Sequence, residues 1–426
     1  MFSVAVIVLS CLLSCGSGDR PPSVVLVIID TLRADHLSCY GYDRATSPNI
    51  DSLAAAGTTW GNTFSQSSWT LPATASIWSG LSPKSHGATM NVGTGEVFGM
   101  DPGMPVLPMI LKSHGYRTAG FLNVYLLGPD FGFHRGFDTY ECDERGDGLA
   151  GETVDRAIEW LTDLQDDESF LLVVHFFDVH DPYDPPAPFD TLFCPGGAAG
   201  ETYWDFAEGG RVARPEQCGH LMGLYDGEIA WVDCELGRLF GALRSLGLSD
   251  STLVILTADH GEEFLDHGYV GHGRTLYQET VHVPIIMSGP GVRAGEVRSE
   301  TVGQIDILPT IMDHCGIAAP EGLEGVSLLE PGLPADRILP ASEINTGLSF
   351  NIASVTDGSE KLIWNADTDS IETYDLQADP GEMHPVHPDS GLLDSVLYYW
   401  ATPCRWRPVP LEAWRVEPVL RDLGYI

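Results

Sequence analysis

The sequence is poor in positive charge. Its 426 residues hold 22 Lys and Arg against 60 Asp and Glu, and the only lysines are Lys84, Lys112 and Lys361. A surface of this sign repels a phosphate backbone, so we expect no nucleic-acid partner. The acidity itself is typical of a solvated surface in a salty or extracytoplasmic setting.

Cysteine pairs at zinc-site spacing, internal repeats and long low-complexity tracts are also missing. Without Cys11 and Cys15, which lie in the N-terminal apolar run, seven cysteines remain. Cys194 and Cys218 bracket a Gly-rich segment that a disulfide could close. Spacing alone does not establish the pairing.

The N-terminal apolar run, residues 1–15, is too short to span a bilayer with its own flanks, and polar residues follow it at once. This pattern predicts an export signal. Residues 12–15, LLSC, resemble a bacterial lipobox in which Cys15 becomes lipidated, although no Lys or Arg precedes the run. The alternatives are an ordinary cleaved signal or a single anchor. We expect an exported protein, periplasmic or on the cell surface, that meets the membrane only through an N-terminal lipid anchor.

Apolar β-branched runs alternate with helical patterns along the body of the chain. The runs at 23–30, 117–121, 170–177, 251–259 and 283–288 predict buried strands. Helices are predicted at 47–57, with an N-cap at Ser47 and a stop at Gly57, and at 106–115 and 154–165. This is the pattern of an α/β fold with a large, mostly parallel sheet flanked by helices.

The domain prediction has three parts. Residues 1–22 form the signal segment and linker, and residues 23–335 form the catalytic domain. After residue 335 the pattern changes to short strand-like pieces separated by turns. Residues 336–426 are therefore predicted to form a small C-terminal α+β subdomain.

Two predicted strands end in acidic residues. One closes on Asp30 and another on Asp259-His260. Ligands collect at the carboxyl ends of strands in open α/β sheets. An Asp at such a place is often a turn former or helix cap, but a carboxylate and an imidazole side by side also suit a divalent metal of borderline hardness.

The stretch SSWTLPATASIWSG, residues 67–80, supplies a hydroxyl. Pro72 suits the first turn of a helix that Gly80 ends, so Thr70 lies at or just before the helix N-terminus. There the helix dipole and free N–H groups favour an anion. The alternative is that Thr70 only caps the helix.

Eleven blocks, in this order, resemble the sulfatase family of the alkaline phosphatase superfamily. They are IIDTLRADHLSCYGY, SPNIDSLAAAGTTWGNTF, TLPATASIWSGLSPKSHG, LKSHGYRTAGF, FGFHRGFDTY, HFFDVHDPYDPP, YDGEIAWVDCELGRL, TADHGEEFLDHGYVGHG, YQETVHVPIIMSGPG, QIDILPTIMDHCG and YDLQADPGE. The resemblance covers nearly the whole mature chain and implies an alkaline-phosphatase-like fold.

The chain departs from the family at the nucleophile. Sulfatases carry C/S-x-P-x-R, whose first residue is oxidised to formylglycine, and here residues 70–74 read TLPAT. Threonine cannot give that aldehyde, and Thr74 replaces the arginine. The family's Gly-Lys-Trp-His block reads LNVY at 122–125, which leaves Asn123 as the residue on the substrate side.

These changes resemble the lipoteichoic acid synthases and phosphoethanolamine transferases of the same superfamily, where threonine is the nucleophile. The resemblance implies one divalent metal ion held by Asp30, Thr70, Asp259 and His260. A histidine in the set favours manganese or zinc, and calcium or magnesium remain alternatives.

Further histidines and a lysine take secondary roles by the same resemblance. His180 matches a substrate-contacting histidine, and a solvent-exposed His272 would give a proton to the leaving oxygen. His267 is a weaker candidate for the same proton donation and is also assigned to substrate binding.

Lys84 and His86, just after the nucleophile helix, are assigned to the transferred group or its ester, with a surface role for Lys84 as the alternative. His175 lies inside an apolar strand and is expected to be a satisfied core residue.

The predicted function is that of an exported, metal-dependent hydrolase that cleaves sulfate or phosphate esters through a covalent intermediate on Thr70. The partner would be a sulfated or phosphorylated small molecule, glycan or lipid headgroup. The alternatives are a phosphotransferase or phosphodiesterase acting on envelope headgroups, and a non-catalytic homologue that binds an anionic glycan. Residues 196–219 are expected to contribute to specificity.

The lipobox predicts that Cys15 carries the lipid anchor. Cells fed a fatty-acid analogue should label the wild-type protein and not Cys15→Ala, because the thiol is the attachment point. Equal labelling of the two proteins, or of neither, would rule the anchor out.

Overall fold

The computed structural model describes residues 21–91, 96–143, 150–194, 215–329, 332–334, 336–344, 351–387, 390–406 and 409–411. The predicted export segment with Cys15, and most of residues 196–219, lie outside these ranges. Within them, no helix combines the length and the apolar character that a membrane crossing requires.

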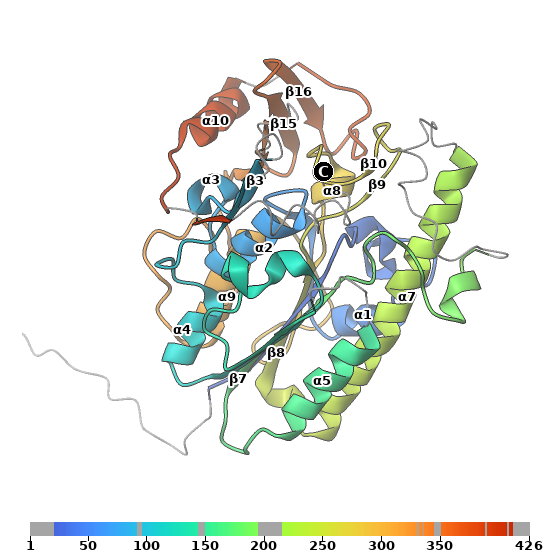
Figure 1. Ribbon diagram of the computed structural model, residues 1–426. Coiled ribbons are helices and arrows are strands. Elements are labelled where there is room, and N and C mark those ends of the chain that lie inside the picture. Colours follow the sequence, from blue (N-terminus) through green and yellow to red (C-terminus); the bar gives the residue numbers. More distant parts are fainter. Residues whose placement is uncertain are drawn as a thin grey trace, which may run out of the picture.

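An eight-stranded sheet forms the centre of the molecule, in the order β12-β2-β11-β8-β1-β7-β5-β6 (Figure 1). Its strands are β1 Ser23–Ile29, β2 Thr58–Phe64, β5 Arg117–Leu122, β6 Thr139–Cys142, β7 Phe170–Phe176, β8 Thr252–Ala258, β11 Ile285–Ser288 and β12 Glu296–Gly303. Only β11 runs antiparallel to its neighbours. The predicted mostly parallel sheet is confirmed.

Strand β1 shows why helices cover both faces. All seven of its residues are buried, and alternate side chains point to opposite faces of a strand. Val24, Leu26 and Ile28 join one apolar cluster, with side chains of α2 Thr70–Ser79, α4 Leu107–Ser113 and α9 Ile307–His314. The intervening residues join a second cluster, with α1 Pro48–Ala55, α5 Ala150–Thr162 and α7 Pro215–Ser245.

The C-terminal part is α+β, as predicted. Strands β13 Leu339–Glu343, β14 Ile352–Thr356, β15 Glu360–Asn365 and β16 Ser370–Asp375 form an antiparallel sheet. Helix α10 Ser390–Ala401 packs on one face, and Ile352, Ile363 and Tyr374 on the other face pack against the body. The boundary near residue 335 stays a prediction.

Short elements complete the described chain. They are the helices α3 Pro83–His86 and α8 Gln278–Val281, the hairpin of β9 Glu263–Phe264 with β10 Val270–Gly271, and the small sheet β17-β4-β3. In that sheet β17 Val409–Leu411 pairs with β4 Glu96–Gly99, and β4 pairs with β3 Thr89–Asn91. The chain thus returns from the C-terminal part to the body.

Ser47 stands at the N-cap of α1, as predicted, although its hydroxyl bonds the Asp51 carboxylate at 3.1 Å and makes no cap bond. One local expectation is not met. Cys194 and Cys218 are both free thiols, so the disulfide does not form. The Cys194 sulfur instead lies 2.6 Å from Nδ1 of His220.

Candidate active site

The pairing of β1 with β8 brings two acidic residues together. Ile29 pairs with Ala258 in parallel register, so the next residues, Asp30 and Asp259, leave the same edge of the sheet side by side. Thr31 follows with φ of 54°, a left-handed conformation that is costly for threonine and typical of functional sites. Its N–H donates to Oδ1 of Asp259 at 3.3 Å, which ties the two strand ends together.

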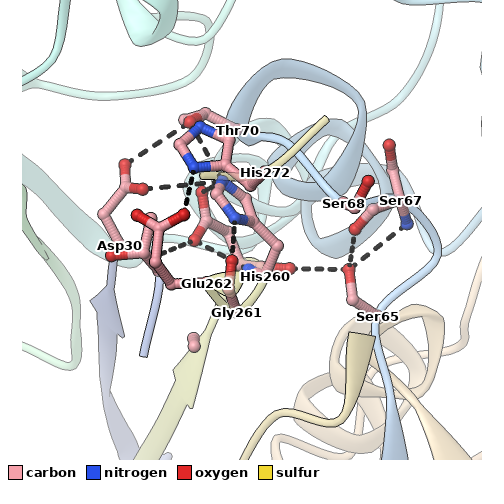
Figure 2. Close-up of polar contacts among 12 residues, drawn as sticks. Asp30, Ser65, Ser67, Ser68, Thr70, His260, Gly261, Glu262 and His272 are labelled. Carbon is pink, nitrogen blue, oxygen red and sulfur yellow. Dashed lines mark hydrogen bonds and ion pairs between the residues drawn. The ribbon is translucent and has the colours of Figure 1, made fainter. Parts of the chain in front are cut away.

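Thr70 is the first residue of α2 and faces this pair. Its Oγ1 lies 3.4 Å from Oδ2 of Asp30 and 3.4 Å from Nε2 of His260 (Figure 2). Trp69 occupies the N-cap, and α2 ends at Gly80 in the left-handed conformation, as predicted. The hydroxyl therefore points into the site from the positive end of a helix.

Three acceptor atoms face one another at the centre of the site. Nδ1 of His260 lies 2.9 Å from the Gly261 carbonyl, so it carries the proton and Nε2 presents a lone pair. This Nε2 is 3.5 Å from Oδ1 of Asp30 and 3.5 Å from Oδ2 of Asp259. Within the described residues neither carboxylate oxygen has a hydrogen-bond partner.

The electrostatics of these three side chains suit the binding of a cation. Asp30, Asp259 and His260 are fully buried. Burial, reinforced by the charges of Asp259 and Glu262, raises the pKa of Asp30 well above its usual value, and burial raises the pKa of Asp259 to about 7. Burial and the neighbouring His272 hold the pKa of His260 well below its usual value, so the ring is neutral. Orphaned oxygens beside a neutral imidazole fit a divalent metal ion.

His175 is not the satisfied core residue that the sequence predicted. Its side chain is buried at the end of β7, and neither ring nitrogen has a hydrogen-bond partner among the described residues. Its Nε2 lies 3.5 Å from Oδ2 of Asp30. Ligand atoms of Asp30, His175 and Asp259 all lie within 4.8 Å of one another, which adds His175 to the candidate metal ligands.

His272 and His180 lie beside His260. The His272 ring is 4.4 Å from that of His260 and 4.9 Å from that of His180. The expected solvent exposure of His272 is wrong, because its side chain is only 5% exposed and Nδ1 lies 3.1 Å from Oε1 of Glu262. His180 stacks on Phe177, and its Nε2 has no partner in the described part of the chain.

Glu262 is a residue of the site that the sequence motifs did not predict. It holds His272 and also accepts a hydrogen bond from the Tyr183 hydroxyl at 3.0 Å. The signal was present as the first of two acidic residues that follow Asp259-His260-Gly261. Gly261 itself is required, because a Cβ there would lie 2.1 Å from the Glu279 carbonyl oxygen.

Lys84 and His86, which follow α2 in the chain, make contacts away from Thr70. His86 is buried and neutral, since burial lowers its pKa to about 3, and its ring nitrogens contact Ser76 Oγ and the Ala88 N–H. The Lys84 ammonium lies over the Trp400 ring, 4.7 Å from its centroid. These contacts give Lys84 and His86 structural roles in this conformation.

Asn123 and His267 are likewise occupied. Asn123 accepts the Phe177 N–H at 2.9 Å and so fixes the end of β7. His267 has both ring nitrogens engaged, with Oε1 of Glu279 at 2.7 Å and the Glu382 carbonyl at 3.0 Å. The contacts that hold Asn123 and His267 do not include Thr70.

The C-terminal sheet supports the loop that precedes Thr70. Oε1 of Glu343, at the end of β13, accepts the Ser68 N–H at 2.5 Å and also bonds the hydroxyls of Ser67 and Ser68. From the body, Ser65 Oγ and Gln304 Nε2 each donate to the Asp259 carbonyl at 2.6 Å. Thr70 and Asp259 are thus positioned by buried hydrogen bonds on both sides.

Comparisons with known proteins agree with this geometry. A model of the family described as Sulfatase matches residues 22–317. Arylsulfatase K of Mus musculus is 26% identical over an alignment 430 positions long, which covers 86% of this chain and 76% of that protein.

Two solved structures share the fold. A protein in complex with its substrate, D-glucosamine-2-N,6-O-disulfate, superposes with a TM-score of 0.76 at 20% identity, covering 95% of this chain and 99% of the other. The phosphonate monoester hydrolase of Agrobacterium radiobacter superposes with a TM-score of 0.70 at 20% identity, covering 94% and 96%.

We predict that Glu343, the last residue of β13 in the C-terminal sheet, positions Thr70. Glu343→Leu leaves buried donors of Ser67 and Ser68 unpaired, so the free energy of unfolding should fall by about 1–3 kcal/mol in urea denaturation. Displacement of Thr70 should lower kcat by about tenfold to 100-fold. Glu343→Gln retains an acceptor oxygen and is the matched control. A leucine variant with wild-type kcat would contradict this role.

Proposed function

This chain belongs to the sulfatase family and is a hydrolase of sulfate or phosphate esters, and on that premise we propose that it works through a covalent intermediate on Thr70. The observation that carries the proposal is the position of Thr70 Oγ1 at a helix N-terminus, 3.4 Å from both Asp30 and His260. An activated hydroxyl at such a position is a nucleophile that needs no formylglycine.

The proposed metal ligands are Asp30, Asp259, His260 and Thr70. His175 is a further candidate ligand, because its Nε2 lies 3.5 Å from Oδ2 of Asp30. The orphaned oxygens of the two aspartates and the lone pair of His260 support this assignment, and an imidazole in the set favours manganese or zinc. A bound ion would lower the pKa of the Thr70 hydroxyl and polarise the ester.

The side chains supply the remaining chemistry. Oδ2 of Asp30 accepts the hydroxyl proton of Thr70, whose oxygen then bonds the sulfur or phosphorus while the bond to the leaving oxygen breaks. His272, held by Glu262, donates a proton to that leaving oxygen. In the second step the same imidazole takes a proton from water, whose oxygen displaces Thr70, and the Asp30 proton returns to the threonine oxygen.

The charge around the site favours a substrate with a single negative charge. The lysine and the histidine of the family's Gly-Lys-Trp-His block are Asn123 and Tyr125 here, so neutral groups replace two cations. Asp30, Asp259 and Glu262 add negative charge close to Thr70, His260 and His272. A sulfate monoester, a phosphodiester or a phosphonate monoester meets less repulsion here than a phosphate monoester dianion.

A sulfated sugar is the first candidate substrate, because the protein solved with D-glucosamine-2-N,6-O-disulfate shares the fold over nearly its whole length. Phosphoester or phosphonate cleavage is the second candidate, because a threonine and an Asp-His pair stand where formylglycine sulfatases differ, and a phosphonate monoester hydrolase has the same fold. 4-Nitrophenyl sulfate, phosphate, phosphodiester and phosphonate, tested with added Mn²⁺, Zn²⁺, Ca²⁺ or Mg²⁺, distinguish the candidates. The export predicted from residues 1–22 would place this reaction outside the cytoplasm.

Thr70→Ala tests the nucleophile. The variant should lose roughly 10³-fold or more in kcat, because the oxygen that forms the intermediate is gone, and Thr70→Ser should retain part of the rate. Rapid quenching followed by mass spectrometry should find a sulfo or phospho adduct on the peptide that contains Thr70.

Ser79→Ala removes a buried hydroxyl from the other end of α2 and should leave kcat unchanged. A Thr70→Ala protein that turns over near the wild-type rate would reduce Thr70 to a structural residue.

Asp259→Asn tests the metal site. Loss of a charged ligand should lower metal content, measured by inductively coupled plasma mass spectrometry, together with kcat. Asp250→Asn changes an exposed aspartate and should bind metal like the wild type. Full metal occupancy in Asp259→Asn would show that the ion lies elsewhere.

A further inference from the structure

A cavity lies along the chain segment that carries His272. Its volume is about 180 Å³, and it lies between the segment Tyr269–Tyr277 and the face of the C-terminal sheet that packs on the body (Figure 1, β10 beside β15 and β16). We call it the rim pocket. Its volume is below the roughly 300–1,000 Å³ of drug-sized pockets, so it suits a single ring.

Strand register connects the rim pocket to the nucleophile loop. Glu343, which bonds Ser67 and Ser68, pairs with Ile352, and Ile352 in turn pairs with Asn365. Residues paired directly across strands share a face, and Ile352 and Asn365 both line the pocket. Two strand spacings amount to roughly 10 Å, so the pocket lies about one or two sugar rings from the loop before Thr70.

The segment on the other side makes the same connection. His272 faces His260, and the Gly273 N–H that follows donates to the Ser68 carbonyl at 2.9 Å. Arg274 comes next and lines the rim pocket. The proposed proton donor and the pocket wall are therefore two residues apart on one tied segment.

Arg274 is the unusual member of this wall. It is exposed, and it makes no ion pair or hydrogen bond with any residue that the structure describes, in a chain with a formal net charge of −38. Most arginines of the described chain have carboxylate partners, as Arg33, Arg117 and Arg298 do. An unpaired guanidinium in an acidic protein is available to an external anion.

The other walls suit a sugar ring. Asn365 uses its side-chain oxygen to accept the N–H groups of Asp367 and Thr368, which leaves its NH₂ as a donor. The Glu372 carboxylate accepts the hydroxyls of Tyr277 and Tyr374 and can accept another. Tyr269, which is 49% exposed, offers an aromatic face.

We propose that the rim pocket is a specificity subsite that binds a sugar ring carrying a second anionic group, with Arg274 as the anion contact. This inference rests on the proposed function, since the reacting ester occupies the site at Thr70. It identifies the substrate class as a multiply charged glycan: the reacting group sits where cations are missing, and a separate sulfate or carboxylate meets Arg274. Tyr269 binds the ring itself.

Calorimetry on the Mn²⁺-loaded Thr70→Ala protein tests this without turnover. The probes are D-glucosamine 6-O-sulfate and D-glucosamine-2-N,6-O-disulfate, which differ by one anionic group. We expect the disulfate to bind about tenfold or more tightly, through a charge-assisted contact. Adding Arg274→Ala should bring the two affinities together, Arg274→Lys should restore part of the difference, and Tyr269→Ala should weaken both probes alike.

Arg293→Ala is the control, because this arginine is 81% exposed and lies outside the pocket. An affinity ratio that Arg274→Ala leaves unchanged, or an absence of binding by both sugars, overturns the subsite. The proposed function fails separately, if the wild type cleaves no ester of the 4-nitrophenyl panel.

Discussion

The site depends on three lone-pair acceptors that the fold holds against one another. The parallel register of β1 with β8 sets Asp30 beside Asp259, and the hydrogen bond from Nδ1 of His260 to Gly261 aims the unprotonated Nε2 at both carboxylates. Burying two such carboxylates without a counter-ion costs several kcal/mol for each charge. The fold therefore sustains this arrangement only if one carboxylate is protonated or a cation is bound. The left-handed Thr31 and the tightly packed Gly261 hold the two strand ends in this arrangement.

Both parts of the chain maintain that arrangement. Ser65 and Gln304 hold the end of β8 from the body, whereas Glu343 reaches from the C-terminal sheet to the loop before Thr70. Burial raises the pKa of Glu343 to about 7, although its bonds to Ser67 and Ser68 oppose that shift. The small C-terminal sheet is thus part of the catalytic geometry, and its packing against the body also forms one wall of the rim pocket.

Features with a signal in local pattern or chain order could be predicted from the sequence. Buried strands, the helix from Thr70 to Gly80 and the acids at strand ends each have such a signal. His175, Glu262 and Arg274 were missed because their roles depend on pairing between distant segments. In the sequence, His175 is one histidine inside an apolar run. Its closeness to Asp30 follows only from the pairing of β7 with β1. The opposite error arose at His86 and His267, where chain proximity to the motifs suggested contact, although their ring nitrogens are bonded to other parts of the protein.

Charge placement links the nucleophile to the choice of substrate. By the family resemblance, a formylglycine sulfatase meets its substrate anion with a lysine and a histidine, and this chain has Asn123 and Tyr125 at those positions. A threonine whose oxygen must become an anion gains from a nearby metal ion and a helix N-terminus, and without the two cations the reacting group has to carry little charge of its own. Affinity for such a group is weak, so binding energy has to come from elsewhere on the substrate and be used to orient it. Arg274, which has no partner among the residues that the structure describes, lines the rim pocket and can supply that energy in a chain this acidic.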